Sequence, residues 1–120
     1  MVSTVPVATA KIAYVEVHAG LARKRREAAL SVREHARAAS QFDRDWPAYV
    51  RVDLTDEVLA TARDLIQRHP LCGFDAVHLA SALAMRQALG EALQFGAADE
   101  RLLRAAAAEG LESLDVEAVP

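Results

Sequence analysis

Three acidic residues stand at positions where a carboxylate could take part in chemistry. Glu16 shares one helix face with Ile12 and Ala19, Asp75 begins the most apolar segment of the chain, and Asp99 directly follows a short apolar stretch. An ionised carboxylate that points toward apolar surface is costly unless a cation or several donors receive it. Mg²⁺ and Mn²⁺ need only a few carboxylate oxygens from separate elements, with water and a substrate phosphate completing the shell. The three residues are therefore sufficient in kind for a divalent metal site.

Each of these acidic residues also has a purely structural explanation. Glu16 can lie exposed at the edge of the apolar stripe, and Asp75 and Asp99 can cap helices and interact with the helix dipole. His78 and Ser81 extend a polar line from Asp75 along the same helix, which fits either the wall of a cleft or a hydrogen-bonded structural histidine. The spacing alone leaves the catalytic and the structural alternatives open.

The length and composition predict one compact domain over residues 1–120. The chain has 120 residues, 52% hydrophobic and 26% charged, so an ordinary core is expected and a second domain has no room. Cys72 is the single cysteine, which excludes an intramolecular disulfide and suits a reducing cytosol. Met1–Ala10 has no basic start and is soon followed by Lys11 and Glu16, which argues against a signal peptide or a membrane span. We therefore expect a soluble, cytoplasmic protein that makes no contact with a membrane.

Charge is divided unevenly along the chain. Residues 1–50 hold 8 Lys and Arg against 5 Asp and Glu, a balance of +3, whereas residues 51–120 hold 6 against 12, a balance of −6. The chain as a whole lacks the net basic charge that is typical of nucleic-acid-binding proteins. The local basic run Arg23–Arg26 fits a nucleic-acid patch or, more simply, a solvated helix face.

Helical and strand-like segments alternate along the chain and predict an α/β fold. Helices are expected at residues 10–40 with a break near the basic run, from an N-cap at Thr55 to about residue 68, at 75–89, and from a cap at Asp99 to a left-handed Gly110. Strands are expected at 4–9, 49–54, 93–98 and 113–119, and a loop at 41–48. Such alternation indicates a mainly parallel sheet with helices on both faces.

Three stretches of the sequence resemble PIN domains, in particular the VapC ribonuclease toxins. GFDAVHLASAL at residues 73–83 resembles the hallmark DAxHLAxAL stretch of that family. FGAADERLL at 95–103, with the following AA and GL pairs, is similar to the family pattern (T/S)xDxxLxxAAxxxGL. IAYVEVHAGLAR at 12–23 is similar to the helix that carries the family's glutamate. The resemblance covers the chain from about residue 5 to residue 116.

The resemblance implies a three-layer α/β/α PIN-like fold and a metal-dependent endoribonuclease that hydrolyses RNA phosphodiesters. By that similarity Glu16, Asp75 and Asp99 are the catalytic residues, and they hold the Mg²⁺ or Mn²⁺ that activates water and stabilises the phosphate. RNA is then the substrate, and a VapB-like antitoxin is the cognate partner.

Two positions depart from the family pattern. PIN domains open with a hydrophobic strand that ends in an aspartate, but Met1–Ala10 contains no acidic residue, and Ala97 stands where the family has Thr or Ser. We therefore expect a sheet that lacks the usual first central strand, with the two N-terminal strands on one side of a gap and the two C-terminal strands on the other. Open strand edges in so small a domain predict an obligatory homodimer, with its interface in Ala10–Ala39.

Two other functions remain compatible with the sequence. A catalytically silent PIN-fold remnant could act as a binding or oligomerisation module, because three acids cannot readily hold a full two-metal site. An unrelated alanine-rich helical scaffold is the third alternative, and it would contain no strands.

Overall fold

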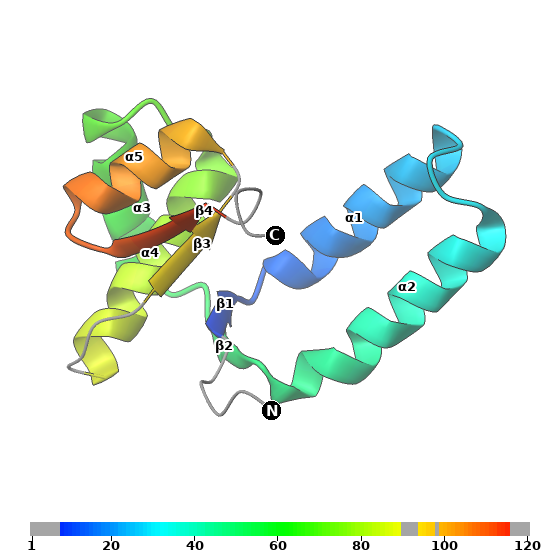
Figure 1. Cartoon of the computed structure of the whole chain (residues 1–120). Helices are drawn as coiled ribbons and strands as arrows, with labels where there is room; N and C mark the ends of the chain where they lie inside the picture. Colours follow the sequence, from blue (N-terminus) through cyan, green and yellow to red (C-terminus); the bar gives the residue numbers. More distant parts are fainter. Residues whose placement is uncertain (1–7, 90–93, 98, 116–120) are drawn as a thin grey trace. The chain divides into compact units, whose positions relative to one another are not determined.

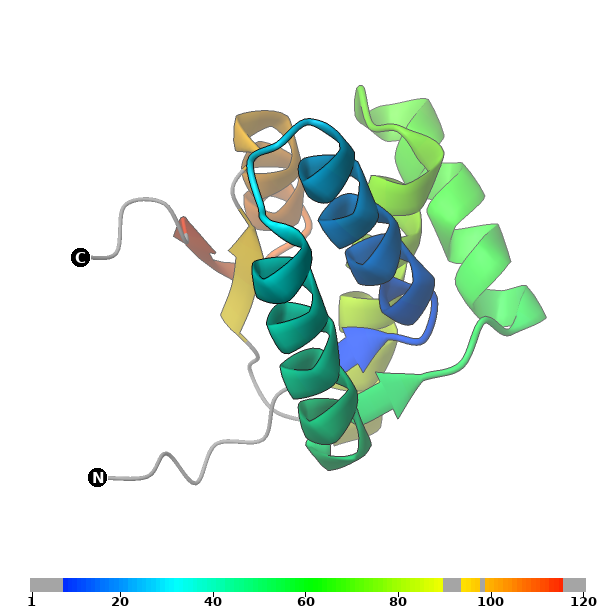
Figure 2. The same cartoon turned by 90° about the vertical axis from the view of Figure 1, so that its right-hand side faces the viewer.

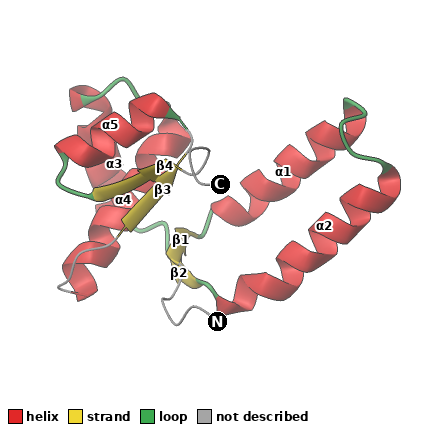
Figure 3. Ribbon diagram, in the orientation of Figure 1, coloured by secondary structure: helices red, strands yellow, loops and turns green. Residues whose placement is uncertain are grey.

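A computed structural model describes residues 8–89, 94–97 and 99–115, in which helices and strands alternate along the chain (Figure 1, Figure 3). Contacts within the chain divide it into two compact units, one in residues 1–51 and the other in residues 52–120. The mixture of helices with strands, including a parallel pair, confirms the predicted α/β class and contradicts the all-helical scaffold. The interpretation of residues 1–120 as one domain stays a prediction.

The N-terminal unit is a helical hairpin with a short strand at each end. β1 (Ala8–Ala10) leads into α1 (Ala13–Arg26), and α2 (Val32–Asp45) returns beside it through the short 3₁₀ helix η1 (Trp46–Ala48) to β2 (Val50–Val52). Figure 2 shows the two long helices side by side. β1 and β2 pair in a two-stranded sheet, which joins the two ends of the hairpin.

The hairpin reverses direction immediately after the basic run, as the sequence predicts. α1 ends at Arg26, and Ala28 adopts a left-handed conformation with φ of 62°. Ser31 then caps α2 in a capping box: its Oγ accepts the backbone N–H of Glu34 at 3.0 Å, and its own N–H donates to Glu34 Oε1 at 2.8 Å. These local bonds fix the point at which the second helix begins.

Aromatic rings join the two helices of the hairpin. None of the residues of α1 and α2 is fully buried. The ring of Tyr14 lies 5.9 Å from that of Phe42 and 5.2 Å from that of Trp46, measured between centroids. Tyr14 Oη also donates to Asp43 Oδ1 at 2.9 Å, and His18 Nε2 lies 2.8 Å from the same oxygen. Both ring pairs are tilted, and aromatic contacts at such separations stabilise packing beyond the area that they bury.

The prediction of a loop at residues 41–48 is wrong. α2 continues through Asp45, and η1 follows it directly. Aspartates are weak helix formers, but Asp43 accepts hydrogen bonds from two side chains of α1, and Pro47 lies in the first turn of η1, where its missing N–H is tolerated. Contacts from a distant helix therefore override the local preferences of this segment.

The C-terminal unit combines three helices with a parallel pair of strands. In chain order it contains α3 (Asp56–Arg68), α4 (Gly73–Leu89), β3 (Gln94–Ala97), α5 (Glu100–Ala108) and β4 (Glu112–Asp115). β3, α5 and β4 form a β-α-β crossover whose two strands are paired in register over their four residues. The crossover places the start of α5 at the carboxyl end of β3.

Small and branched apolar side chains from all three helices form the core of this unit. Leu65 of α3 and Leu79 of α4 are completely buried, and Ala76 and Ala80 let α4 approach its neighbours closely. The remaining core residues are Val58, Ala62, Leu102, Ala105, Ala106 and Leu111. α4 begins two residues earlier than predicted, at Gly73, and its packing fixes the position of its first turn.

The ends of the helices follow the sequence prediction. Thr55 Oγ1 accepts the N–H of Val58 at 3.2 Å and caps α3. Gly110 has a φ of 86° after α5, and the N–H of Leu111 donates back to the carbonyl of Ala106 at 3.0 Å, which is the Schellman pattern. Leu111 is buried and supplies the apolar contact that accompanies such a cap.

Among the described residues, β1 pairs with β2 and β3 pairs with β4. The expected lack of the first central strand stays a prediction. The predicted strands at 4–9, 93–98 and 113–119 lie partly outside the described residues, and the parts inside are extended. Over the described ranges, no helix is both long and apolar enough to span a bilayer.

Candidate active site

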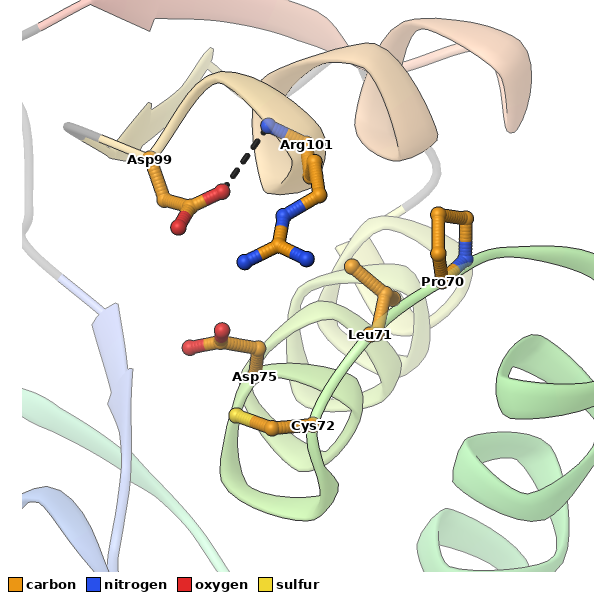
Figure 4. Close-up of a pocket in the computed structure, with 6 residues that line it drawn as sticks. All are labelled: Pro70, Leu71, Cys72, Asp75, Asp99 and Arg101. Atoms are coloured by element: carbon orange, nitrogen blue, oxygen red, sulfur yellow. Dashed lines mark hydrogen bonds between the residues drawn. The ribbon is translucent and has the colours of Figure 1, made fainter.

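Asp75 and Asp99 line the same open pocket in the C-terminal unit. The pocket has a volume of about 510 Å³, and its walls come from the segment between α3 and α4 and from the starts of α4 and α5. Figure 4 shows the six side chains that line it: Pro70, Leu71, Cys72, Asp75, Asp99 and Arg101. Two carboxylates that are 24 positions apart in the sequence thus meet in one cavity.

Asp75 is held in place by the helix that it begins. It lies in the first turn of α4 and is half-buried. The next residue, Ala76, is fully buried, and its N–H donates to the carbonyl of Cys72 at 3.0 Å. These contacts tie the first turn of α4 to the core, so the Asp75 carboxylate is presented to the pocket from a rigid base.

Asp99 is the N-cap of α5, as the sequence predicts. Its Oδ1 accepts the backbone N–H of Arg101 at 2.8 Å and that of Leu102 at 3.1 Å. Both cap bonds end on one oxygen, so Oδ2 takes no part in the cap. A helix cap and a bond to a cation are therefore compatible at this residue.

Sequence reasoning assigned neither Arg101 nor Cys72, the two other polar or reactive side chains of the pocket, to the site. The Arg101 side chain leaves the first turn of α5 and extends into the space between the carboxylates of Asp99 and Asp75 (Figure 4). Cys72 is an exposed free thiol on the opposite wall. The available signal was spacing: Arg101 follows the predicted cap by two residues, and Cys72 precedes Asp75 by three.

Glu16 lies in α1, in the N-terminal unit, where it is half-buried. It is not one of the residues that line the pocket, and its participation in a site with Asp75 and Asp99 stays a prediction. In the part of the chain that the structure describes, no three or more His, Cys, Asp or Glu side chains gather closely enough to hold a metal ion. The two pocket carboxylates fit a divalent cation in kind, because Mg²⁺ and Mn²⁺ favour oxygen ligands, but they supply only part of a coordination shell.

The polar line that continues from Asp75 along α4 does not extend the pocket. Ser81 is fully buried, and its hydroxyl donates to the carbonyl of Val77 at 2.7 Å, which satisfies it within the helix. Neither Ser81 nor His78 lines the pocket. For Ser81 the structural explanation holds.

Two hydrogen-bonded clusters elsewhere perturb pKa values. In the hairpin, bonds from His18 and Tyr14 hold the pKa of Asp43 below its ordinary value, and the bond to Asp43 raises the pKa of Tyr14. In the C-terminal unit, His69 and then Arg68 lower the pKa of Glu109. His69 Nε2 lies 2.7 Å from Glu109 Oε2, and this bond joins the end of α3 to the end of α5. None of these groups lines the pocket, so we interpret both clusters as structural.

The chain is similar in sequence to two ribonucleases of Mycobacterium tuberculosis. Ribonuclease VapC45 of strain CDC 1551 / Oshkosh and Ribonuclease VapC49 of strain ATCC 25618 / H37Rv are each 43% identical to it over 77 residues, which is 64% of this chain and 54% of the relative. The chain therefore spans about half the length of the curated relatives it matches. No family model matches the sequence. The resemblance to VapC ribonucleases thus has partial support from two named relatives.

Proposed function

We propose that this chain is a PIN-fold protein of the VapC type that hydrolyses RNA phosphodiesters. The observation that carries the proposal is the meeting of Asp75 and Asp99 in one pocket, each at the start of a helix. The similarity to two proteins named ribonucleases supports the reaction class. A cytoplasmic location, suggested by the single free cysteine, belongs to the same proposal.

In this proposal Asp75 and Asp99, together with Glu16, hold Mg²⁺ or Mn²⁺. The ion, when bound, supplies Lewis-acid activation of a water molecule and neutralises charge on the phosphate. Asp99 contributes Oδ2, because Oδ1 caps α5. Asp75 contributes from the opposite side of the pocket, on a helix whose core packing prevents it from moving away. In the reaction a water oxygen forms a bond to phosphorus, and the bond from phosphorus to the leaving ribose oxygen breaks.

The test is cleavage of a mixed RNA pool by the chain freed of any partner, with Mn²⁺ and with EDTA. We expect cleavage with Mn²⁺ only, and its loss in Asp75→Asn. Asp64→Asn is the matched control, since Asp64 is an exposed aspartate of α3 that does not line the pocket. No cleavage with either Mn²⁺ or EDTA would contradict the enzyme hypothesis. Cleavage that survives in Asp75→Asn would contradict the assigned site.

A catalytically silent binding or oligomerisation module is the second candidate. It is motivated by two features of the sequence: Met1–Ala10 contains no acidic residue to match the family's first aspartate, and Ala97 brings no hydroxyl to the end of β3. Titration with Mn²⁺ discriminates between the two functions. One weak site without RNA degradation supports the silent module, whereas two sites or robust turnover support the nuclease.

A homodimer and a VapB-like antitoxin are the partners in this proposal. α1 and α2 contain no fully buried residue, and Val15 and Val32 are 64% and 71% exposed, which leaves apolar surface for another chain to cover. Both valines lie in the predicted interface, Ala10–Ala39. Sedimentation at micromolar concentration tests the dimer, and a stable, cooperatively folding monomer would contradict it.

A further inference from the structure

The C-terminal unit is an unfavourable surface for RNA. Residues 52–120 hold 5 Lys and Arg against 12 Asp and Glu, a balance of −7. A polyanion that enters the pocket also meets the carboxylates of Asp75 and Asp99. At physiological ionic strength, charges interact over roughly 8 Å, so the two carboxylates repel a phosphate that enters the pocket. Only a cation inside the same pocket is close enough to offset that repulsion. Arg101 is the cationic side chain of the pocket lining.

The position of Arg101 is set by its neighbours. Its backbone N–H donates to Asp99 Oδ1 at 2.8 Å, which fixes its Cα beside the cap, and Leu102 after it is buried in the core. From this fixed point the side chain reaches into the pocket (Figure 4). Among the described residues, no ion pair joins its guanidinium to either carboxylate. Its donors therefore remain available to an anion.

The other arginines of this unit are placed differently. Arg68 pairs with Glu109 at 3.1 Å, and Arg86 donates to the carbonyl of Glu109 at 3.3 Å, so both hold the end of α5. Arg63 and Arg104 are exposed and do not line the pocket. Arg101 thus combines a site in the pocket with donors that are not already bound.

We infer that Arg101 is the phosphate-binding residue of this pocket, where its guanidinium takes the non-bridging oxygens of an RNA phosphodiester beside Asp75 and Asp99. The inference rests on the proposed function for its choice of RNA as the anion. A guanidinium stays charged at any physiological pH, and its planar fork of N–H donors matches two phosphate oxygens. The alternative is that Arg101 only neutralises the two carboxylates, in which case it competes with a divalent ion and does not bind RNA.

The test compares two arginines of the same helix. Binding of a short fluorescein-labelled, mixed-sequence single-stranded RNA is measured by anisotropy in EDTA, so that no cleavage occurs. We expect Arg101→Gln to weaken binding roughly tenfold or more, as for the loss of a charge-assisted bond, and to lower the slope of log K against log salt by about 1. Arg101→Lys keeps the charge and loses the planar fork of donors, so its RNA affinity should lie between that of the wild type and that of Arg101→Gln. Arg104→Gln removes the same charge outside the pocket and should change binding by less than about twofold.

The single cysteine provides a readout that does not depend on cleavage. Cys72 lines the pocket, so bound RNA should slow its alkylation by iodoacetamide. We expect this protection in the wild type and in Arg104→Gln, and its loss in Arg101→Gln at the same RNA concentration. Mn²⁺ alone should still slow the alkylation of Cys72 in Arg101→Gln. That result would show that the variant keeps its pocket.

The outcomes separate this inference from the proposed function. Equal weakening of RNA binding in Arg101→Gln and Arg104→Gln would overturn the inference, even if Asp75→Asn abolishes Mn²⁺-dependent cleavage. Unchanged RNA binding with tighter Mn²⁺ protection in Arg101→Gln would identify Arg101 as a neutralising residue and would also overturn it. If RNA does not slow the alkylation of Cys72 in the wild type, the inference is overturned as well. Arg101-dependent RNA binding without any cleavage would support the inference and contradict the nuclease.

Discussion

Substitutions at Asp99 can separate its helix cap from its negative charge. Oδ1 accepts the N–H groups of Arg101 and Leu102 at 2.8 and 3.1 Å, and Oδ2 takes no part in the cap. Asparagine keeps a carbonyl oxygen in place of Oδ1 and caps helices about as well as aspartate does. Asp99→Asn therefore retains the cap and loses the charge that a divalent ion requires. Asp99→Ala loses both.

The expected effects differ in size between stability and metal binding. Asp99→Ala should lower the free energy of unfolding by about 1 kcal/mol, the usual cost of a lost N-cap. Asp99→Asn should stay within about 0.5 kcal/mol of the wild type, since only the charge–dipole interaction is lost. Both variants should bind Mn²⁺ at least about tenfold more weakly, because even changes behind the ligands of a metal reach that size.

Urea unfolding followed by circular dichroism measures the first effect, and calorimetric titration with Mn²⁺ measures the second. Glu100→Gln is the matched control, because Glu100 is the exposed neighbouring acid of α5 and does not line the pocket. A stability loss in Asp99→Asn as large as in Asp99→Ala would refute the assignment of the helix cap to Oδ1 and of metal binding to Oδ2. Unchanged Mn²⁺ affinity in both variants would place the ion elsewhere.

Three further predictions concern stability. His69, and next Arg68, lower the pKa of Glu109 from its ordinary 4.5, so its ionised form stabilises the fold above that pH, and this contribution is lost as the pH falls through the lowered pKa. Glu109→Gln should therefore lower the free energy of unfolding by about 1–2 kcal/mol near neutral pH, measured in urea, and by progressively less below pH 4.5. A loss that does not change with pH would contradict the stabilising role of ionised Glu109. Gly110→Ala should cost about 1 kcal/mol by the same measurement, since φ is 86°, and an unchanged midpoint would mean that the turn can rearrange. Leu79→Ala should cost about 2–5 kcal/mol, because Leu79 is completely buried, and a loss below about 1 kcal/mol would show that the core collapses around the gap.

The parts of the fold that could be predicted from sequence are those fixed by near neighbours. Thr55 and Asp99 cap helices through bonds to N–H groups two or three residues away, and Gly110 closes α5 through bonds that span only five residues. The break after the basic run is likewise local, because the capping box of Ser31 spans three residues. Short-range bonds leave a signature in the order of residue types, and that signature was sufficient here.

The errors arise where distant residues decide the structure. The segment at 41–48 is helical because Tyr14 and His18, more than 20 positions away, hold Asp43 and pack on its neighbours. Nothing in the local pattern of aspartates and proline indicates those partners. The hairpin is joined by ring contacts, and aromatic spacing across two helices has no simple one-dimensional period.

The candidate site shows the same division between local and distant information. Each of Asp75 and Asp99 is explained locally as a residue at the start of a helix, and a local explanation cannot distinguish a cap from a ligand. The structure adds that both side chains line one pocket and that the Asp99 cap uses one oxygen only. It also adds Arg101, whose residue type gives no signal in the sequence and whose side chain lines the same pocket. Under the proposed function the two carboxylates bind a divalent cation and the guanidinium binds a phosphate, and RNA hydrolysis requires both at once.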